Sequence, residues 1–550
     1  MNQGYDYLIV GAGAAGCVLA NRLSADPGVR VALIEAGPSD RGFPANWKTT
    51  VPIGNVFLLP HARYNWQHVF RGGAGVNGRE IACPRGRIFG GCTSVNGTVY
   101  IRGHRQDYDD WAIDGWRYDD VLPFFKRHEN RALGMSPFHG AGGELDVQHL
   151  RDPNPLSRAF VEAAVQAGYH SNDDFNGAVQ DGFGLFELNQ RAGARLSSSR
   201  AFLHPVLERS NLTVYSDALV ERILMRGRRA VGVRVRYRGQ CLELDAGTEV
   251  ILSAGAINSP QLLMLSGIGP AAMLRRHGIA VIEDRRGVGA NLQDHPTVSV
   301  AVANPGAQSY ALTWRTASRA ALAPLNYLFG RRGMLASNAA EAGGFIRSTP
   351  GLDRPDVQYT FMVGMKESAR TLPRRHGVVL HAALLRPLAR GSVTLASADP
   401  AARPVLEGRF LEHQAEVDTL IRGLREARRI LGMPAIARYT GEEYAPGAAS
   451  TSDAELEAFV RNYTATTYHP VGTCRMGASG DADAVVDAQL RVHGVDGLRV
   501  VDASIMPNII GGNTAAPSMM IGERAAALIS GEPAQARKHN SVSARHALIA

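Results

Sequence analysis

The N-terminal sequence contains a glycine pattern that is compatible with few local folds. The turn GAGAAG (11–16) directly follows the apolar run YLIV (7–10), which is typical of a buried parallel strand. CVLANRLSA (17–25) then places apolar residues at helical spacing, and VALIEAG (31–37) is a second buried run. The order strand, tight turn, helix and strand predicts a βαβ unit.

Each glycine of the GxGxxG turn has its own physical role. Gly11 permits the tight turn, Gly13 lets the backbone approach a pyrophosphate, and Gly16 allows the helix to pack closely on the strand. The first N–H groups of the helix, around Ala14 and Ala15, are then free to bind phosphate. The pattern therefore predicts that a dinucleotide binds at this turn.

Glu35 supports this interpretation, because it ends the second predicted strand 19 residues after Gly16. A carboxylate there can accept hydrogen bonds from a ribose diol. The alternative is a glycine-rich turn beside an unrelated surface glutamate, which the flanking strand and helix disfavour. The fingerprint alone does not separate NAD from FAD.

A second glycine-rich loop favours FAD. PRGRIFGGCTSVNGTVYIRG (84–103) is rich in glycine and poor in titratable groups. A nicotinamide enzyme has no need of such a loop, whereas FAD needs backbone around both its pyrophosphate and its isoalloxazine.

Patterns in the rest of the chain predict further strands and helices, as in an α/β protein. VERILMRGRRAVGVRVRYRG (220–239) predicts antiparallel strands, and EVILSAGA (249–256) a buried strand. Ser259 and Pro260 suit the N-cap and first position of a helix. GLRVVDAS (497–504) predicts a late strand and APSMMIGERAAALIS (516–530) a late helix.

Between about 310 and 465, alternating stretches such as PDVQYTFM and GVVLHAALL predict an antiparallel sheet with helices. We therefore expect a discontinuous Rossmann-like FAD-binding domain with an inserted α+β domain that binds substrate. The expected ranges are 1–155, 205–310 and 466–533 for the FAD-binding domain, 156–204 and 311–465 for the substrate-binding domain, and 534–550 for a loose tail.

Composition and charge limit the kinds of partner and compartment that we expect for this protein. The net charge is +8, but the basic residues are scattered and form no basic helix or aromatic-interleaved patch, which disfavours nucleic-acid binding. Peripheral contact with an anionic membrane stays open as an alternative. The five cysteines have no metal-type spacing and fit a reduced compartment. With no signal-peptide pattern and no apolar run of ~18 residues, we expect a cytoplasmic enzyme, or one peripheral on the inner membrane.

The chain closely resembles the glucose–methanol–choline (GMC) family of FAD-dependent oxidoreductases, in particular the bacterial branch of choline dehydrogenases, alcohol dehydrogenases and hydroxymethylfurfural oxidases. The matching segments span nearly the whole chain in family order: GAGAAG with Glu35, PRGRIFGGCTSVNG (84–97), SAGAINSPQLLMLSGIGP (253–270), GVGANLQDHP (287–296), YHPVGTCRMG (468–477) and VVDASIMPNIIGGNTAAPSMMIGERAA (500–526).

The resemblance implies roles for the reacting groups. The family's HP motif places its catalytic base near flavin N5 at His469, and the partner in the GNT loop is Asn513. Some members attach FAD covalently through a histidine at the position of Val95, so the resemblance implies non-covalent FAD here.

Alcohol chemistry agrees with these roles. Oxidising an alcohol removes a hydroxyl proton and a carbon-bound hydride, and a histidine such as His469 suits the base that takes the proton. The Asn513 amide can hold the alcohol oxygen. The helix that follows would direct its positive end toward charge on the reduced flavin. The alternative for Asn513 is a helix-capping role.

Further positions are expected at the cofactor through the same resemblance. Asn96 and Gly97 would lie beneath the flavin, Val220 would contact adenine through its backbone, and Asp502 would lie near the ribityl-pyrophosphate region or cap the next turn. The remaining expected cofactor positions are Gly90, Gly91, Ala503 and Thr514.

Two residues are expected on the substrate side. Tyr468 precedes the base and should lie near flavin and substrate. Glu341 aligns with a glutamate that binds the choline cation in choline oxidases, although relatives acting on neutral alcohols have it too. For His295, in a second HP dipeptide, we expect a structural role, because its motif lies outside the flavin-facing loops.

The expected activity is oxidation of a primary alcohol to an aldehyde, with electrons passed to a quinone or another carrier. One alternative is an oxidase of aryl or furanic alcohols that uses O2 and forms H2O2. A second is a choline dehydrogenase. A third, from another functional class, is a flavin-binding protein without alcohol chemistry.

Overall fold

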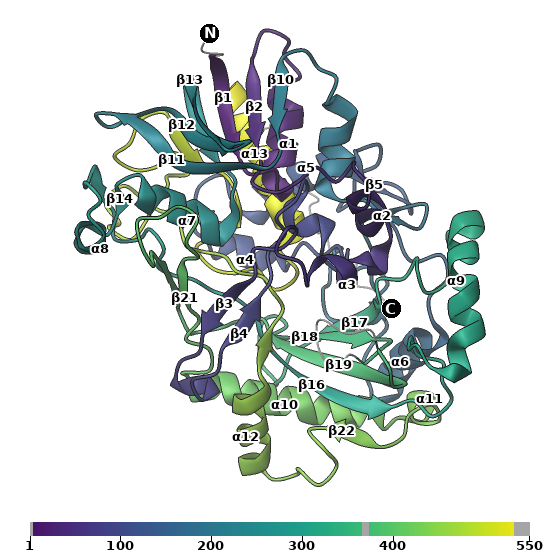
Figure 1. Ribbon diagram of the computed structural model, residues 1–550. Coiled ribbons are helices and arrows are strands. Elements are labelled where there is room, and N and C mark those ends of the chain that lie inside the picture. The colour runs from purple at the N-terminus through teal and green to yellow at the C-terminus, as the bar shows by residue number, and fades with distance from the viewer. Residues whose placement is uncertain (1–3, 366–372, 533–550) are drawn as a thin grey trace, which may run out of the picture.

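Two seven-stranded sheets organise the chain in the computed structural model, which describes residues 4–365 and 373–532 (Figure 1). The tail expected at 534–550 lies outside the described residues. One sheet carries the N-terminal fingerprint and the other is antiparallel. The predicted class, a Rossmann-like α/β unit combined with an antiparallel sheet and helices, is confirmed.

The first sheet has a parallel part in the order β10, β2, β1, β13, β24. These strands are β10 (Leu212–Tyr215), β2 (Val31–Ile34), β1 (Tyr5–Val10), β13 (Gln240–Leu252) and β24 (Leu498–Val500). All four residues of β2 are buried, as a parallel strand covered on both faces requires.

The same sheet has an antiparallel extension. The first half of β13 pairs with β12 (Arg229–Tyr237), which pairs with β11 (Ala218–Arg226), while the second half of β13 pairs with β1. The antiparallel strands predicted over 220–239 are therefore confirmed. Because β13 belongs to both parts, it connects the hairpin rigidly to the strands that carry the fingerprint.

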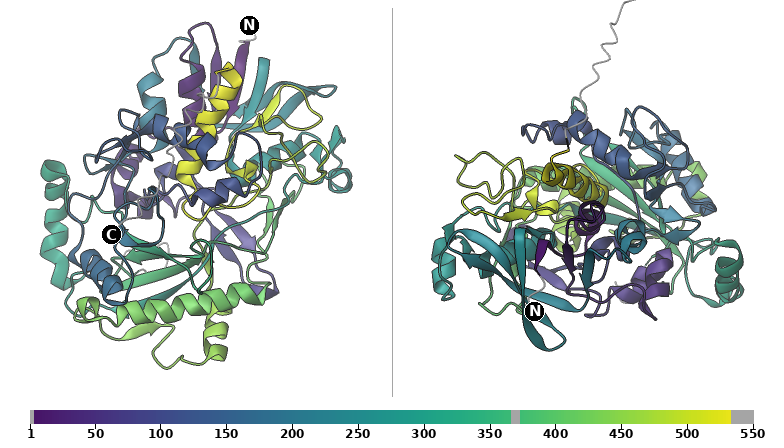
Figure 2. Two further views of the ribbon diagram at one scale, coloured as in Figure 1. Left: turned by 180° about the vertical axis from the view of Figure 1, so that it is seen from behind. Right: turned by 90° about the horizontal axis from the view of Figure 1, so that it is seen from above.

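Helices α1 (Ala14–Leu23) and α13 (Ala515–Ser530) pack side by side against this sheet, although one is near the start of the chain and the other near its end (Figure 2). The contact depends on Gly522, where a Cβ would lie 2.9 Å from the carbonyl oxygen of Ala15. The predicted first and last helices are thus joined in one layer.

Helix α7 (Gly255–Leu265) begins five residues earlier than the sequence predicts. Ser259 and Pro260 lie inside it rather than at its start. Proline lacks an N–H and leaves the carbonyl four residues earlier without its helical partner. That carbonyl, on Ala256, accepts a hydrogen bond of 2.6 Å from Oγ1 of Thr473 instead, so a distant residue lets the helix continue through Pro260.

The second sheet runs in the order β22, β16, β19, β18, β17, β7, with β23 also paired to β16, and is antiparallel. Its strands are β22 (Glu443–Ala445), β16 (Pro296–Ala303), β19 (Gly377–Leu384), β18 (Val357–Met362), β17 (Ala340–Ile346), β7 (Gly182–Leu185) and β23 (Ala465–Thr466). Helices α10 (Gln414–Leu431) and α6 (Pro155–Gln166) contact it.

The expected domain boundary at 310 needs adjustment. β16 (296–303) is a central strand of the second sheet, yet the expected FAD-binding range of 205–310 includes it. The chain passes from one sheet to the other within the QDHP motif (293–296), because β16 begins at Pro296, the last residue of that motif. With that change the division into two domains remains a proposal.

A smaller sheet joins the two parts in the order β20, β21, β3, β4. Its strands are β20 (Ser392–Thr394), β21 (Val405–Glu407), β3 (His68–Arg71) and β4 (Ile81–Cys83). The other helices are α2 (Ala45–Thr50), α3 (Asn55–Leu58), α4 (Arg105–Asp109), α5 (Tyr118–His128), α8 (Ala271–Arg276), α9 (Ala317–Gly330), α11 (Pro434–Ala437) and α12 (Asp453–Tyr463).

The remaining strands form short pairs. They are β5 (Glu129–Arg131) with β6 (Leu145–Val147), β8 (Gln190–Arg191) with β9 (Ala194–Arg195), and β14 (Ile268–Gly269) with β15 (Glu283–Asp284). In the part of the chain that the structure describes, no helix has both the length and the apolar character needed to cross a membrane.

Candidate active site

A cavity of about 590 Å³ is lined by residues of both large sheets. Its size is that of a site for a small organic ligand. Most positions that the sequence predicts at the cofactor or substrate line it, namely Gly11, Gly13, Ala14, Ala15, Glu35, Gly91, Val95, Asn96, Gly97, Val220, Tyr468, His469, Asp502, Ala503, Asn513 and Thr514. Residues far apart in sequence therefore meet in one place.

Two of the expected glycines act beside the cavity rather than in its wall. A Cβ at Gly16 would lie 1.9 Å from the carbonyl oxygen of Gly11, so Gly16 allows the helix to pack on the turn. Gly90 has a φ of +84°, and a Cβ there would lie 2.3 Å from Oγ of Ser94. Both residues shape the cradle through backbone geometry alone.

One end of the cavity fits the adenosine and pyrophosphate parts of a dinucleotide. Helix α1 begins there with no side-chain cap, which leaves its first N–H groups free for phosphate oxygens. A Cβ at Gly91 would lie 2.9 Å from Cα of Gly13, so two backbone segments converge where side chains would obstruct a ligand.

Glu35 lies at the same end of the cavity. Its carboxylate accepts hydrogen bonds from the backbone N–H of Ala12 at 3.0 Å and of Gly37 at 2.8 Å. Burial raises the pKa of Glu35 to about 7, against the opposing effect of these two bonds. The side chain is thus held in one position where the ribose diol of a dinucleotide would contact it.

His469 lies at the other end, where its ring makes contacts through both nitrogen atoms. Nε2 lies 3.3 Å from Nδ2 of Asn513, and Nδ1 lies 2.9 Å from Oγ1 of Thr467. Burial, and then the positive charge of Arg85, lower the pKa of His469 to about 3. The imidazole is therefore neutral at ordinary pH, and one of its nitrogen atoms carries an unprotonated lone pair.

Gln358 on β18 determines which nitrogen carries that lone pair. Its Nε2 donates to Oδ1 of Asn513 at 3.2 Å, which turns the amide nitrogen of Asn513 toward His469. An amide nitrogen can only donate, so Nε2 of His469 accepts and the ring proton is on Nδ1. Gln358 was not predicted from the sequence, since only strand pairing brings it here.

Asn513 is not a helix cap. Helix α13 starts at Ala515, its N-cap is Thr514, and no side chain caps it. The alternative considered for Asn513 therefore does not apply, and its side chain is available at the cavity. The free N–H groups at the start of α13 give this end of the cavity a second positive helix terminus.

His295 lies directly behind His469, closer to the reacting group than the sequence indicates. Their Nδ1 atoms are 3.2 Å apart and the two rings are nearly perpendicular, at 88°. Oδ1 of Asp294 accepts from the backbone N–H of both histidines, at 2.8 Å each. The chain has three HP dipeptides, beginning at His204, His295 and His469, so this shared pattern alone could not have linked His295 with His469.

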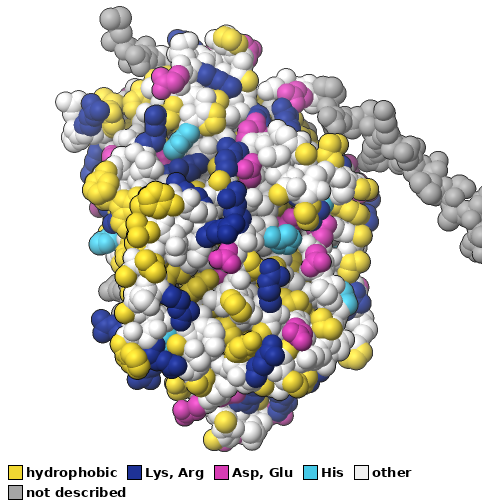
Figure 3. All heavy atoms as spheres, turned by 90° about the vertical axis from the view of Figure 1, so that its right-hand side faces the viewer, with side chains coloured by type: hydrophobic (Ala, Val, Ile, Leu, Met, Phe, Trp, Pro, Cys, Tyr) yellow, Lys and Arg dark blue, Asp and Glu magenta, His cyan; other side chains and the backbone are white. Residues whose placement is uncertain are grey.

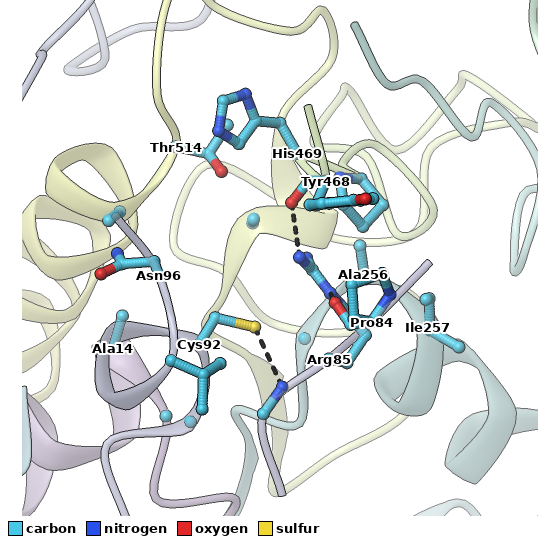
Figure 4. Close-up of a pocket in the computed structure, with 18 of the residues that line it drawn as sticks. Ala14, Pro84, Arg85, Cys92, Asn96, Ala256, Ile257, Tyr468, His469 and Thr514 are labelled. Atoms are coloured by element: carbon cyan, nitrogen blue, oxygen red, sulfur yellow. Dashed lines mark hydrogen bonds between the residues drawn. The ribbon is translucent and has the colours of Figure 1, made fainter. Parts of the chain in front are cut away.

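Tyr468 has an unusual backbone. Its φ of +65° lies in the left-handed region, which aromatic side chains rarely adopt and which is typical of strained functional sites. Nη2 of Arg85 donates to its carbonyl oxygen at 2.5 Å. Figure 4 shows this contact beneath His469, with Asn96 and Ala14 across the cavity. Arg85 thereby helps to hold the backbone that carries the histidine.

The expected substrate role of Glu341 does not fit its position. Its carboxylate is buried outside the cavity wall and accepts hydrogen bonds from four groups: the backbone N–H of Asn154 and the hydroxyls of Ser157, Tyr310 and Ser337. A carboxylate satisfied in this way is not available to bind a substrate cation. The family resemblance aligned Glu341 with a substrate-binding glutamate, but it carried no information about the residues that surround Glu341 in this fold.

For Asp502 the structure supports the capping alternative. Its carboxylate accepts from the backbone N–H of Ser504 and Gly255 at 2.9 Å each, and from the hydroxyl of Ser259 at 2.6 Å. It therefore fixes the starts of two helical segments, α7 and the helical turn at 503–505. Its role at the cavity wall is to hold these segments in place.

Comparison with known proteins agrees with this geometry. Residues 5–297 match the N-terminal family model and residues 387–522 the C-terminal family model, both described as GMC oxidoreductase. The chain is similar to alcohol dehydrogenase (acceptor) of Pseudomonas putida, with 44% identity over 533 residues, 96% of this chain and 95% of that protein.

Two further comparisons cover nearly the whole chain. Human mitochondrial choline dehydrogenase is 42% identical over 540 residues, 96% of this chain and 90% of that protein. The crystal structure of pyridoxine 4-oxidase from Mesorbium loti aligns with a TM-score of 0.86 and 31% identity over 96% of this chain and 99% of that one.

Proposed function

The chain belongs to the GMC oxidoreductase family, and from this premise we propose that it oxidises a primary alcohol to an aldehyde and passes the electrons to a quinone or another carrier. It is an FAD-dependent oxidoreductase that acts on CH–OH donors. The observation that carries the assignment is the pair of atoms at the end of the cavity, Nε2 of His469 and Nδ2 of Asn513.

These two atoms are complementary to an alcohol hydroxyl. Nε2 of His469 has a lone pair that can accept the hydroxyl proton, and the Asn513 amide can donate to the alcohol oxygen. FAD, when bound in the cavity, supplies the acceptor for the hydride. The two residues orient the hydroxyl, because both contacts must be made at once.

The groups around His469 also set the charge at this end of the cavity. His469 is neutral because of burial and Arg85, so it is ready to accept a proton without first losing one. Once protonated, it would gain a positive charge close to Asp294, which accepts from its backbone N–H. The free N–H groups of α13 would stabilise negative charge at the same end of the cavity.

The cavity wall favours a neutral alcohol over choline. Strands β16, β18 and β19 contribute uncharged side chains: Thr297, Ser299, Gln358, Thr360, Met362 and His381, the last with a pKa lowered to about 4 by burial. The Glu341 carboxylate already accepts four hydrogen bonds outside the cavity. These described wall residues therefore offer no carboxylate for a quaternary ammonium group. Choline dehydrogenase nevertheless remains the second candidate, because relatives with that name are about as similar to the chain.

The proposed acceptor is a carrier rather than O2. Support comes from the 44% identical relative, whose name is alcohol dehydrogenase (acceptor). An oxidase that forms H2O2 is the rival, and the structural relative pyridoxine 4-oxidase represents it. A carrier such as a quinone also agrees with peripheral membrane contact by a chain of net charge +8, whereas nucleic acid is not proposed as a partner.

Non-covalent attachment of FAD is part of the proposal. Val95 lines the cavity in the loop beneath the proposed flavin position, and its side chain has no nucleophilic atom. Denaturing the purified enzyme should release all of its flavin into the supernatant. Flavin that stays with the precipitated protein would contradict this part.

The deciding experiment is anaerobic reduction of the purified holoenzyme with aliphatic, aromatic, furanic and polyether alcohols and with choline. Reduction by neutral primary alcohols, followed by fast reoxidation with a quinone and slow reoxidation with O2, is expected. Rapid H2O2 formation without an added acceptor would favour the oxidase. Reduction by choline far above all neutral alcohols would favour choline dehydrogenase, and no reduction by any alcohol would reject the activity.

A further inference from the structure

An apolar surface lies on the side of the molecule that carries α9. Phe43, Trp314 and Phe329 are 90%, 87% and 88% exposed. We call this surface the α9 face; its exposed apolar members are Phe43, Trp47, Phe57, Leu312, Trp314, Leu322, Leu325, Leu328 and Phe329. They account for half of the 18 large exposed apolar side chains of the described residues.

The two segments that form the α9 face are in contact. Tyr327 of α9 packs with Val51 and Ala336, and its hydroxyl lies 3.4 Å from the carbonyl oxygen of Thr50. In α9 only Ala323 and Tyr327 are buried, so most of the helix circumference is left exposed. The exposed apolar side chains therefore lie on neighbouring elements of one side of the molecule, and such a grouping is typical of an interaction surface.

The two segments that form the α9 face carry basic residues and no acidic ones, although Figure 3 shows acidic side chains of other segments on the same side of the molecule. Residues 41–66 and 311–340 contain no Asp or Glu. Of the basic residues in these segments, Arg63 lies 3.7 Å from Asp217, and the others form no ion pair with a described carboxylate: Arg41, Lys48, Arg315, Arg319, Arg331 and Arg332. Figure 3 looks onto this side and shows hydrophobic and basic side chains next to one another.

We propose that the α9 face docks on an anionic lipid bilayer. Exposed aromatic and leucine side chains of an amphipathic helix enter the interface between headgroups and acyl chains, while arginines beside them bind anionic headgroups. A second copy of the chain is a poorer partner, because two identical cationic faces would repel each other. The arginines that have no carboxylate partner, of which Arg315 and Arg319 donate only to backbone carbonyl oxygens, thus select an anionic surface.

Docking on this face would place the cavity beside the membrane. Phe57 of α3 is exposed on the α9 face, whereas Asn55 of the same helix, with Leu59 just after it, lines the cavity. A single turn of helix therefore separates the two surfaces. This arrangement gives the proposed peripheral membrane contact a specific surface. It rests on the proposed function, in which a lipid-soluble acceptor would approach the cavity from the bilayer.

The test is co-sedimentation of the holoenzyme with vesicles of phosphatidylcholine alone and of phosphatidylcholine with phosphatidylglycerol. Binding only to the anionic vesicles, and weaker binding at higher salt, is expected. In the variant Arg315→Gln with Arg319→Gln, affinity should fall about fivefold for each arginine removed. Leu325→Ser with Phe329→Ser should weaken binding at least tenfold by removing the inserting side chains.

Matched controls are available on the opposite side of the molecule. Arg226→Gln with Arg238→Gln removes two exposed arginines, one at the end of β11 and one in the turn between β12 and β13. Val69→Ser changes an exposed apolar residue on β3 (Figure 1). Both should bind vesicles as the wild type does. Equal binding by all variants, or no vesicle binding by the wild type, would overturn the proposal.

A change of oligomeric state would also overturn it. If Leu325→Ser with Phe329→Ser converts a dimer to a monomer in light scattering, the α9 face is an interface between copies. Turnover with a water-soluble electron-accepting dye separates this proposal from the proposed function. The α9-face variants should keep full dye turnover, so a failure of vesicle binding leaves alcohol oxidation intact, and a lack of alcohol turnover leaves vesicle binding intact.

Discussion

Nε2 of His469 lies 3.3 Å from the amide nitrogen of Asn513, although 44 residues separate them in the chain. If His469 is the base, His469→Ala should lower the rate of anaerobic flavin reduction by an alcohol about a hundredfold or more. FAD content and thermal stability should change little, because the ring lies at the wall of a cavity. A rate within a few-fold of wild type would remove His469 from the chemistry.

Gln358 should act through Asn513. Gln358→Leu removes the donor to Oδ1 of Asn513, and the loss of one such hydrogen bond predicts a flavin-reduction rate about fivefold lower. Asn513→Ala should cost more. Adding Gln358→Leu to Asn513→Ala should then change nothing further, and two fully additive effects would show that Gln358 acts independently.

Gln358→Glu gives a sharper version of this test. A carboxylate would attract the amide nitrogen of Asn513 and turn its oxygen toward His469. The expected rate is therefore below that of Gln358→Leu, even though the glutamate is closer in shape to the native side chain. Flavin reduction in a stopped-flow instrument measures both variants, and the reverse order of rates would reject the proposed amide orientation.

Glu35 should make FAD binding depend on pH. Burial raises the pKa of Glu35 to about 7, and the ionised form is the better acceptor for ribose hydroxyls. Affinity for FAD, measured by titrating the apoprotein, should therefore increase from pH 6 to pH 8. Glu35→Gln should bind FAD about ten- to a hundredfold more weakly at pH 8 and show little of this pH dependence.

Buried His128 should make the protein less stable in acid. Burial lowers the pKa of His128 to about 3, whereas an unfolded histidine has a pKa of about 6.5. The unfolded state binds the proton first, so the stabilisation is full above pH 6.5 and is lost as the pH falls toward 3. Glu35 and Asp294, with raised pKa values of about 7 and about 6, act in the opposite direction.

His128→Gln isolates this contribution. Its melting temperature should fall less than that of the wild type between pH 6.5 and pH 4.5, because the remaining groups are the same in both proteins. Differential scanning calorimetry of the holoenzyme provides the measurement. Parallel curves for the two proteins would mean that His128 is not protonated on unfolding in this range.

The N-terminal unit was predictable because its signals are local. A buried strand, a turn that needs glycine and an apolar helix follow one another within residues 5–23, and each supports the others. The same kind of local signal misplaced the start of α7. Ser259 and Pro260 are a common helix start, but a hydroxyl from Thr473, far along the chain, satisfies the carbonyl that Pro260 leaves free.

The end of the cavity around His469 was predictable in part. Family resemblance pointed to His469 and Asn513, whereas Gln358 is 155 residues from Asn513 and reaches it only through the register of β18. Glu341 was assigned to the substrate because alignment compares residues but not their neighbours. Its hydrogen bonds to Ser157, Tyr310 and Ser337 depend on how β17 packs, which no sequence pattern defines.

The packing of α1 against α13 has a consequence for how the cell makes the enzyme. The fingerprint turn leaves the ribosome long before α13, the helix that packs against α1 and ends at Ser530. Asn513, which faces His469, lies just before that helix. The cofactor cradle therefore stays incomplete until α13 has been synthesised, and FAD can be held fully only after that.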